Sequence, residues 1–139
     1  MKKISLVVLL FSVFLLAGCA TETVENGGQE ETVKANYVDV SPAEAKALID
    51  AEPDLIIIDV SPHYDEGHLP GAVHHYIGDG SLDAAIHMLN PNDEYLVYCH
   101  VDSVAIAGAQ KLIDAGFMNV YRLEGNYPGW VEAGYPIEK

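Results

Sequence analysis

The sequence predicts an α/β domain of three layers, with a mainly parallel five-stranded sheet and helices on both faces. Two observations lead to this prediction. Apolar stretches of strand length alternate with stretches of helical pattern, and the links between them are short. The runs at 54–60 (DLIIIDV) and 94–99 (EYLVYC) are apolar almost throughout, as expected for central strands that are covered on both sides.

The first half of the domain supplies three strands and two helices. A short strand at 37–40 leads to a helix at 43–51, where Ser41, Pro42 and Glu44 form a capping-box start. The strand at 54–60 is followed by 71–76 (GAVHHY), which suits a short strand. Ser81 is expected to cap a helix at 82–89, which the Asn-Pro pair at 90–91 stops.

The second half repeats the alternation. The strand at 94–99 precedes a helix at 104–116, with Gly116 at its C′ position. A last strand at 119–124 and a short helix at 127–134, closed by Gly134, complete the domain. Trp130 lies in this helix at a spacing that folds it back onto the sheet, so its indole is expected in the core.

Composition limits the partners of this chain. It has 139 residues, half of them hydrophobic, which suits one compact domain. Its net charge of −14 argues against nucleic acid or an anionic membrane surface as a partner, because both would repel an acidic protein.

The N-terminus resembles a prokaryotic lipoprotein signal peptide at 1–18. A basic start (MKK) is followed by an apolar segment too short to span a membrane, and then by Leu-Ala-Gly-Cys, which resembles a lipobox. This predicts that Cys19 is lipidated and that the protein is anchored to the cell membrane on its extracytoplasmic side. An uncleaved anchor is the alternative. Residues 19–36 are polar and predict a flexible tether, with the folded domain at 37–139.

Cys99 is the other cysteine of the chain and has no partner once Cys19 carries a lipid. It ends a central strand and precedes a helix, so it is expected at the carboxyl edge of the sheet, where α/β domains bind ligands. Backbone N–H groups of the following loop would favour its thiolate. The alternative is a buried structural cysteine.

Four motifs in order resemble the rhodanese (sulfurtransferase) family from Tyr37 to the C-terminus. They are Asp59 after the second strand, the segment 66–72 (EGHLPGA), Cys99 at a strand end, and the tail Gly125, Trp130, Gly134 and Pro136. The resemblance implies that Cys99 is the catalytic residue, which carries sulfur as a persulfide from a donor to an acceptor. It also implies an active-site loop made of His100, Val101, Asp102, Ser103 and Val104. In this family His68 is expected to be structural.

The loop departs from the family pattern in its charges. Val104 stands where the family usually has Arg, Asp102 where it often has Gly, and Ser61 where the motif after the second strand has Arg. A helix N-terminus stabilises an anion by about 0.3–1 kcal/mol. A unit charge at about 4 Å contributes about 4 kcal/mol at an effective dielectric near 20. We therefore expect Asp102 to oppose the thiolate, a Cys99 pKa near or above the ordinary value, and very weak thiosulfate activity.

His100 is a candidate proton shuttle. Paired with Asp102 in an acidic neighbourhood, its pKa is expected to rise; the alternative is an exposed loop histidine. Cys99, His100 and His63 could approach one another, but their spacing matches no established metal signature, so neither a metal nor a cofactor is predicted.

The resulting hypothesis is a lipid-anchored domain that transfers sulfane sulfur through Cys99. Its partners would be a sulfur donor or acceptor, either a small molecule or a protein thiol, and the membrane through the N-terminal lipid. A non-catalytic binding module on the same fold is the alternative.

Overall fold

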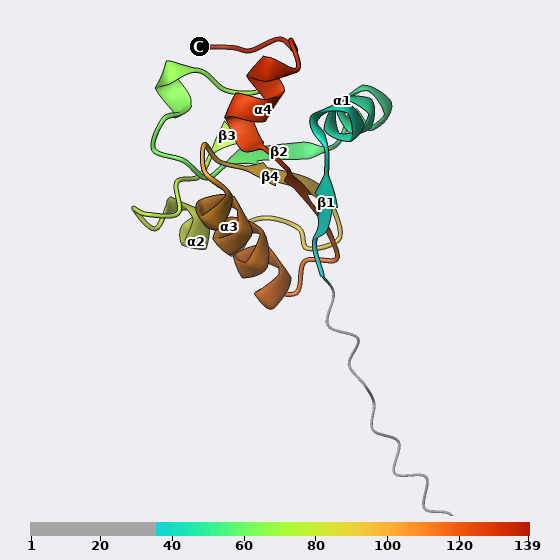
Figure 1. Cartoon of the computed structure of the whole chain (residues 1–139). Coiled ribbons are helices and arrows are strands. Elements are labelled where there is room, and N and C mark those ends of the chain that lie inside the picture. Colours follow the sequence, from blue (N-terminus) through green and yellow to red (C-terminus); the bar gives the residue numbers. More distant parts are fainter. Residues whose placement is uncertain (1–35) are drawn as a thin grey trace, which may run out of the picture. The chain divides into compact units, whose positions relative to one another are not determined.

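The computed structural model describes residues 36–139, and in that range five parallel strands form one sheet in the order β1-β5-β4-β2-β3 (Figure 1). This confirms the predicted fold class. The strands are β1 (Val38–Val40), β2 (Ile56–Asp59), β3 (Val73–His74), β4 (Glu94–Tyr98) and β5 (Asn119–Leu123). The helices are α1 (Pro42–Ala51), α2 (Ser81–Ile86), α3 (Asp102–Asp114) and α4 (Asn126–Glu132), with a 3-10 turn, η1, at Tyr64–Glu66.

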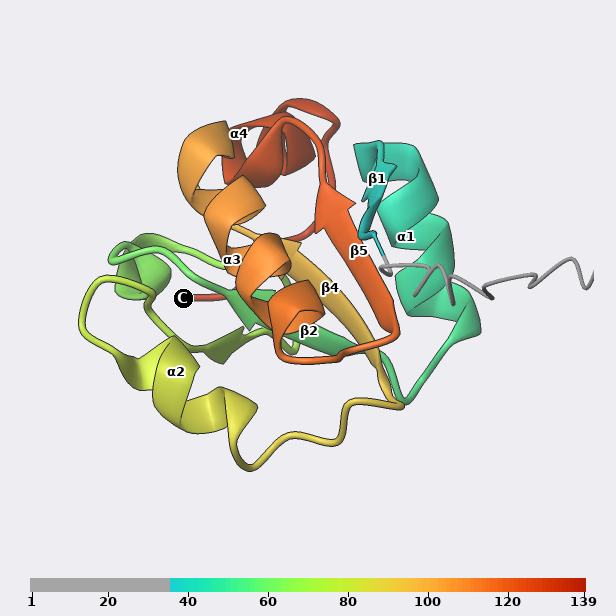
Figure 2. The same ribbon diagram turned by 90° about the horizontal axis from the view of Figure 1, so that it is seen from below.

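Helices α2 and α3 cover one face of the sheet, and α1 and α4 cover the other (Figures 1 and 2). Strand β4 explains how both layers form. Tyr95 and Val97 point into the core beneath α2 and α3, while Leu96 and Tyr98 point into the core beneath α1 and α4. Because side chains alternate across a strand, an apolar run without breaks fills both cores.

The helix ends agree with the sequence signals at three places. Ser41 and Glu44 form the predicted capping box, in which each side chain bonds the other residue's backbone N–H. Gly116 and Gly134 follow α3 and α4 in the left-handed conformation, with φ of 91° and 80°. Trp130 of α4 is 1 % exposed and its indole N–H donates to the Pro136 carbonyl, so the predicted core position is confirmed.

Several element boundaries differ from the prediction, most clearly in α2, α3 and β3. Helix α2 ends at Ile86 instead of residue 89, and its N-cap is Gly80, with φ of 83°. Ser81 therefore lies inside the helix and does not cap it; its N–H is bonded by the side chain of Asp79. Helix α3 begins at Asp102 instead of 104, and β3 shrinks to two residues because only Val73 and His74 pair with β2.

The predicted signal peptide, Cys19 and nearly all of the predicted tether lie outside the described residues. Among residues 36–139, no helix has the length and apolarity needed to cross a membrane.

Candidate active site around Cys99

Cys99 immediately follows β4, and β4 lies between β5 and β2 in the sheet. The topology therefore brings it to the carboxyl edge of the sheet, next to the start of α3, as predicted. The residue is only 2 % exposed and belongs to the core beneath α3. Both of its main-chain polar groups bind the start of α4. Its N–H donates to Asn126 Oδ1 at 3.1 Å, and its carbonyl accepts from the N–H of Tyr127 at 3.0 Å.

Three influences determine the charge state of the Cys99 thiol. Burial raises its pKa, and this is the largest effect. The backbone N–H groups of Val101 and His100 lower the pKa, as expected for the loop. The carboxylate of Asp59, at the end of β2, raises the pKa again. The net direction is upward, so the protonated thiol is favoured.

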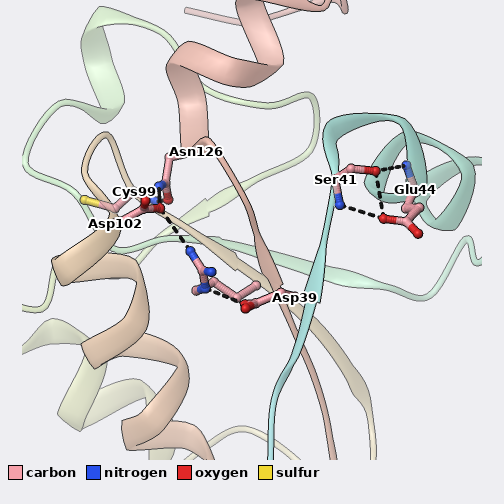
Figure 3. Close-up of polar contacts among 7 residues, drawn as sticks. Asp39, Ser41, Glu44, Cys99, Asp102 and Asn126 are labelled. Atoms are coloured by element: carbon pink, nitrogen blue, oxygen red, sulfur yellow. Dashed lines mark hydrogen bonds and ion pairs between the residues drawn. The ribbon is translucent and has the colours of Figure 1, made fainter.

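Asp102 does not oppose the thiolate in the way the sequence suggested. Its Oδ1 accepts hydrogen bonds from Arg122 Nη1 at 3.0 Å and from Asn126 Nδ2 at 2.6 Å. In Figure 3 the Cys99 sulfur points away from the Asp102 carboxylate and from Asn126. Asp102 is ion-paired with the one arginine of the chain, and the carboxylate that raises the pKa of the thiol is that of Asp59.

The prediction that His100 pairs with Asp102 is also wrong. The His100 ring stacks on Tyr127, with ring centroids 4.5 Å apart, and lies 5.1 Å from the ring of His63. Burial lowers the pKa of His100, whereas the acidic neighbourhood was expected to raise it; the carboxylate of Asp59 opposes burial but does not overcome it. Within residues 36–139 the Nε2 atom of His100 is buried without a hydrogen-bond partner.

The remaining loop residues supply no positive charge. Val101 is the extended N-cap of α3 and is exposed, Ser103 is exposed in the first turn, and Val104 packs partly against the core beneath α3. Ser61, which stands where the family motif has Arg, is completely buried, and its hydroxyl accepts from the N–H of His63. These four side chains therefore add no positive charge to the backbone N–H groups of the loop.

The segment 66–72 supports the loop from the side. A side chain at Gly67 would place its Cβ 2.1 Å from the hydroxyl of Tyr127, so glycine is needed for Tyr127 to lie against this segment and stack on His100. His68 stacks on Tyr64, and its Nδ1 lies 3.0 Å from the carbonyl of Tyr64. These contacts agree with the structural role predicted for His68.

The sequence reasoning missed four contributors to the site: Asn126, Tyr127, Arg122 and the charge of Asp59. The Gly-Asn pair at 125–126 was a usable signal, since asparagine is the non-glycine residue that best tolerates left-handed turns. Although His63 and His100 approach each other, the part of the chain that the structure describes has no group of three His, Cys, Asp or Glu residues able to hold a metal ion.

Sequence and structure comparisons place this architecture among known proteins. The chain is 28 % identical over 110 residues to the putative sulfur carrier protein YrkF of Bacillus subtilis, covering 77 % of this chain and 58 % of that protein. It is 30 % identical over 96 residues to the thiosulfate sulfurtransferase GlpE of Coxiella burnetii, covering 68 % of this chain and 87 % of that enzyme.

Two solved structures are similar to this chain as well. The polysulfide-sulfur transferase homodimer of Wolinella succinogenes superposes with a TM-score of 0.62 at 29 % identity, covering 76 % of this chain and 80 % of that one. The Alr3790 protein of Anabaena superposes with a TM-score of 0.65 at 28 % identity, covering 71 % and 81 %. Residues 41–133 match the profile of the rhodanese-like domain. The chain therefore belongs to the rhodanese-like domain family.

Proposed function

We propose that this protein transfers sulfane sulfur through a persulfide on Cys99. The observation that carries the proposal is the position of Cys99 directly after β4, ahead of a loop whose N–H groups at Val101 and His100 lower the pKa of its thiol. Relatives of this fold are named sulfurtransferases or a sulfur carrier, which supports the same chemistry.

The transfer needs only one nucleophile. The Cys99 thiolate attacks the outer sulfur of a persulfide donor, R–S–SH. A new S–S bond forms to Cys99 while the S–S bond of the donor breaks, and the donor leaves as a thiolate that takes up a proton. An acceptor thiolate then attacks the outer sulfur of the Cys99 persulfide, and Cys99 is regenerated. The sulfur atom moves at constant oxidation level, so no external oxidant is required.

The charges around the thiol favour a neutral or protein-bound donor over thiosulfate. No Arg or Lys lies in the loop 99–104, and the Asp59 carboxylate acts on the sulfur. The repulsion between like charges grows with the charge of the donor, and thiosulfate carries two negative charges. A persulfide or polysulfide sulfur of lower charge meets a smaller repulsion.

His100 is the proposed proton shuttle. Its buried Nε2 has no hydrogen-bond partner within residues 36–139, and burial keeps the ring neutral by lowering its pKa. A neutral imidazole in the residue that follows the thiol could accept the thiol proton and later return it to the leaving group.

The second candidate is a binding module that does not turn over. The observations that favour it are the 2 % exposure of Cys99 and the raised pKa of its thiol. Structural cysteines have both properties.

Mass spectrometry after incubation with each donor separates the two functions. We expect the protein to gain one sulfur atom on Cys99 from polysulfide or glutathione persulfide, and much less from thiosulfate. The Cys99→Ser variant should gain none. Val104→Arg should raise loading from thiosulfate at least tenfold, since about 1.4 kcal/mol suffices for that factor. If no donor adds sulfur to Cys99, the binding module is correct.

We further propose that Cys19 is lipidated and that the domain is held at the extracytoplasmic side of the membrane. The support is the Leu-Ala-Gly-Cys sequence directly after a short apolar segment. The membrane would then be a partner through the lipid, and the sulfur donor or acceptor would be met outside the cytoplasm.

A further inference from the structure

Asn126 has an unusual backbone conformation. Among residues 36–139 it is the one residue other than glycine with a positive φ, at 55°, and it is 2 % exposed. Asparagine adopts this left-handed conformation more readily than most residues, but glycine adopts it without cost. A buried asparagine here is therefore explained by what its side chain binds.

Both polar atoms of the Asn126 side chain bind the loop that begins at Cys99 (Figure 3). Its Oδ1 accepts the N–H of Cys99 at 3.1 Å, and its Nδ2 donates to Asp102 Oδ1 at 2.6 Å. The next N–H in the chain, that of Tyr127, donates to the carbonyl of Cys99. The start of α4 thus fixes both main-chain polar groups of Cys99 and also the first residue of α3.

This arrangement is fixed to the sheet through Arg122. The Arg122 guanidinium donates to Asp102 from Nη1 at 3.0 Å and to Asp39 from Nε at 2.6 Å. Its side chain is 8 % exposed. Asp102 is therefore held from β5 by Arg122 and from α4 by Asn126, and it cannot move with the loop unless both contacts break.

We propose that Asn126 is a positioning residue that couples the main chain of Cys99 to the start of α3, so that the N–H groups of His100 and Val101 face the sulfur. A role of Asn126 in catalysis rests on the proposed sulfur transfer. The coupling itself affects the ionisation of the Cys99 thiol and does not depend on turnover. If the coupling is lost, the loop N–H groups no longer point in fixed directions and the thiolate loses their hydrogen bonds.

The charged and titratable groups near the thiol come from three elements. Asp59 acts on it from the end of β2, and His100 follows it in the loop. Asp102, at the start of α3, forms an ion pair with Arg122, which also pairs with Asp39. The variants below leave Asp59 and His100 unchanged. Asn126→Gly adds no charge, so a shift in its thiol titration reports on the coupling, and the pair in which Asn126 and Asp102 are exchanged keeps the total charge of the wild type.

The test is the rate of Cys99 alkylation as a function of pH in the full-length protein. Asn126→Gly keeps the left-handed backbone and removes both side-chain bonds. Asn126→Asp keeps the acceptor for the Cys99 N–H but places a carboxylate against Asp102. Combining Asn126→Asp with Asp102→Asn exchanges donor and acceptor, which restores the hydrogen bond between the two positions at unchanged total charge.

We expect the midpoint of the alkylation profile to rise in Asn126→Gly by about half to one pH unit, so that the thiolate fraction at neutral pH falls roughly three- to tenfold. Asn126→Asp should raise it further, and the exchanged pair should bring it back toward the wild-type midpoint. Asn119→Gly is the matched control. It removes one hydrogen bond, to the carbonyl of Asn92, at the opposite end of β5, and should not move the midpoint.

A purely structural role for Asn126 predicts a different pattern, in which the variants lose thermal stability while the midpoint stays at the wild-type value. That pattern, or an exchanged pair that behaves like Asn126→Asp alone, overturns the proposal. Neither readout uses turnover, so failure of sulfur transfer in the mass-spectrometric test remains distinguishable from failure of the coupling.

Discussion

At the scale of single residues, the carboxylate of Asp59 acts on more than one titratable group at the site. It is fully buried; its Oδ1 accepts the N–H of Ser61 at 2.8 Å, and its Oδ2 has no hydrogen-bond partner within residues 36–139. Its charge helps to raise the pKa of Cys99, and burial and Asp59 together raise the pKa of Tyr98. The negative charge of the Asp59 carboxylate favours the protonated form of each neighbouring acid.

Replacing Asp59 with Asn should lower the pKa of the Cys99 thiol. The change removes the negative charge and keeps an oxygen for the Ser61 N–H, while burial of the thiol is unchanged. The midpoint of Cys99 alkylation against pH should therefore fall and the rate at neutral pH should rise. Asp54→Asn, an exposed aspartate just before β2, is the matched control and should leave the profile unchanged. A midpoint that stays constant or rises in Asp59→Asn contradicts this account.

At the scale of elements, α4 joins the fold to the site. Its first residues bind Cys99, and further along the helix Trp130 packs into the core beneath α1 and α4. The Trp130 ring also lies 4.8 Å from the ring of Tyr135, and its N–H is bonded to Pro136. The chain after α4 is therefore folded back against the helix that positions the nucleophile.

Trp130→Ala should lower the free energy of unfolding by about 3–5 kcal/mol, because it leaves a large cavity in a closed core. Trp130→Phe, which keeps an aromatic ring but loses the bond to the Pro136 carbonyl, should cost less. Urea titration followed by circular dichroism measures both. A loss below about 1 kcal/mol for Trp130→Ala would mean that α4 is peripheral to the core.

At the scale of the whole molecule, acid should destabilise the domain. Burial lowers the pKa of His100 and of His75 below the ordinary 6.5. Above that value neither the folded nor the unfolded chain protonates these rings. As the pH falls below it, the unfolded chain binds protons that the folded chain resists, and the free energy of unfolding decreases until the folded-state pKa values are passed.

Denaturant midpoints measured at about pH 7.5 and about pH 5.5 should therefore differ in the wild-type protein, and differ less in His100→Asn. His87→Asn alters an exposed histidine and serves as the control. Equal pH dependence in wild type and His100→Asn would show that the buried imidazole does not resist protonation.

Membrane attachment is a prediction about the whole chain. Cys19→Ala should leave an unprocessed precursor, which mass spectrometry and gel mobility detect, because lipidation precedes cleavage in lipoproteins of this kind. The wild-type protein should partition into detergent on phase separation. A mature species in both forms whose masses differ only by the substitution itself, with the same partitioning, would refute lipidation at Cys19.

Local patterns were sufficient to predict most of the fold and part of the site. The apolar runs predicted the central strands, Ser41 and Glu44 predicted the start of α1, and the strand ending before Cys99 predicted where the thiol lies. Each of these features depends on residues within a few positions of one another. The start of α2 was not predicted because Gly80 and Asp79 begin it in place of Ser81.

The sequence by itself determined the layered fold, the loop without a positive side chain, and a thiol at the edge of the sheet. Only the tertiary structure decided which charge reaches that thiol. Asp102 is turned toward Arg122 and Asn126, residues 20 and 24 positions away, and Asp59 acts on the sulfur from another strand. Electrostatic and hydrogen-bond energies depend on distance and direction in space, and parallel pairing of β2, β4 and β5 fixes these between segments far apart in the chain.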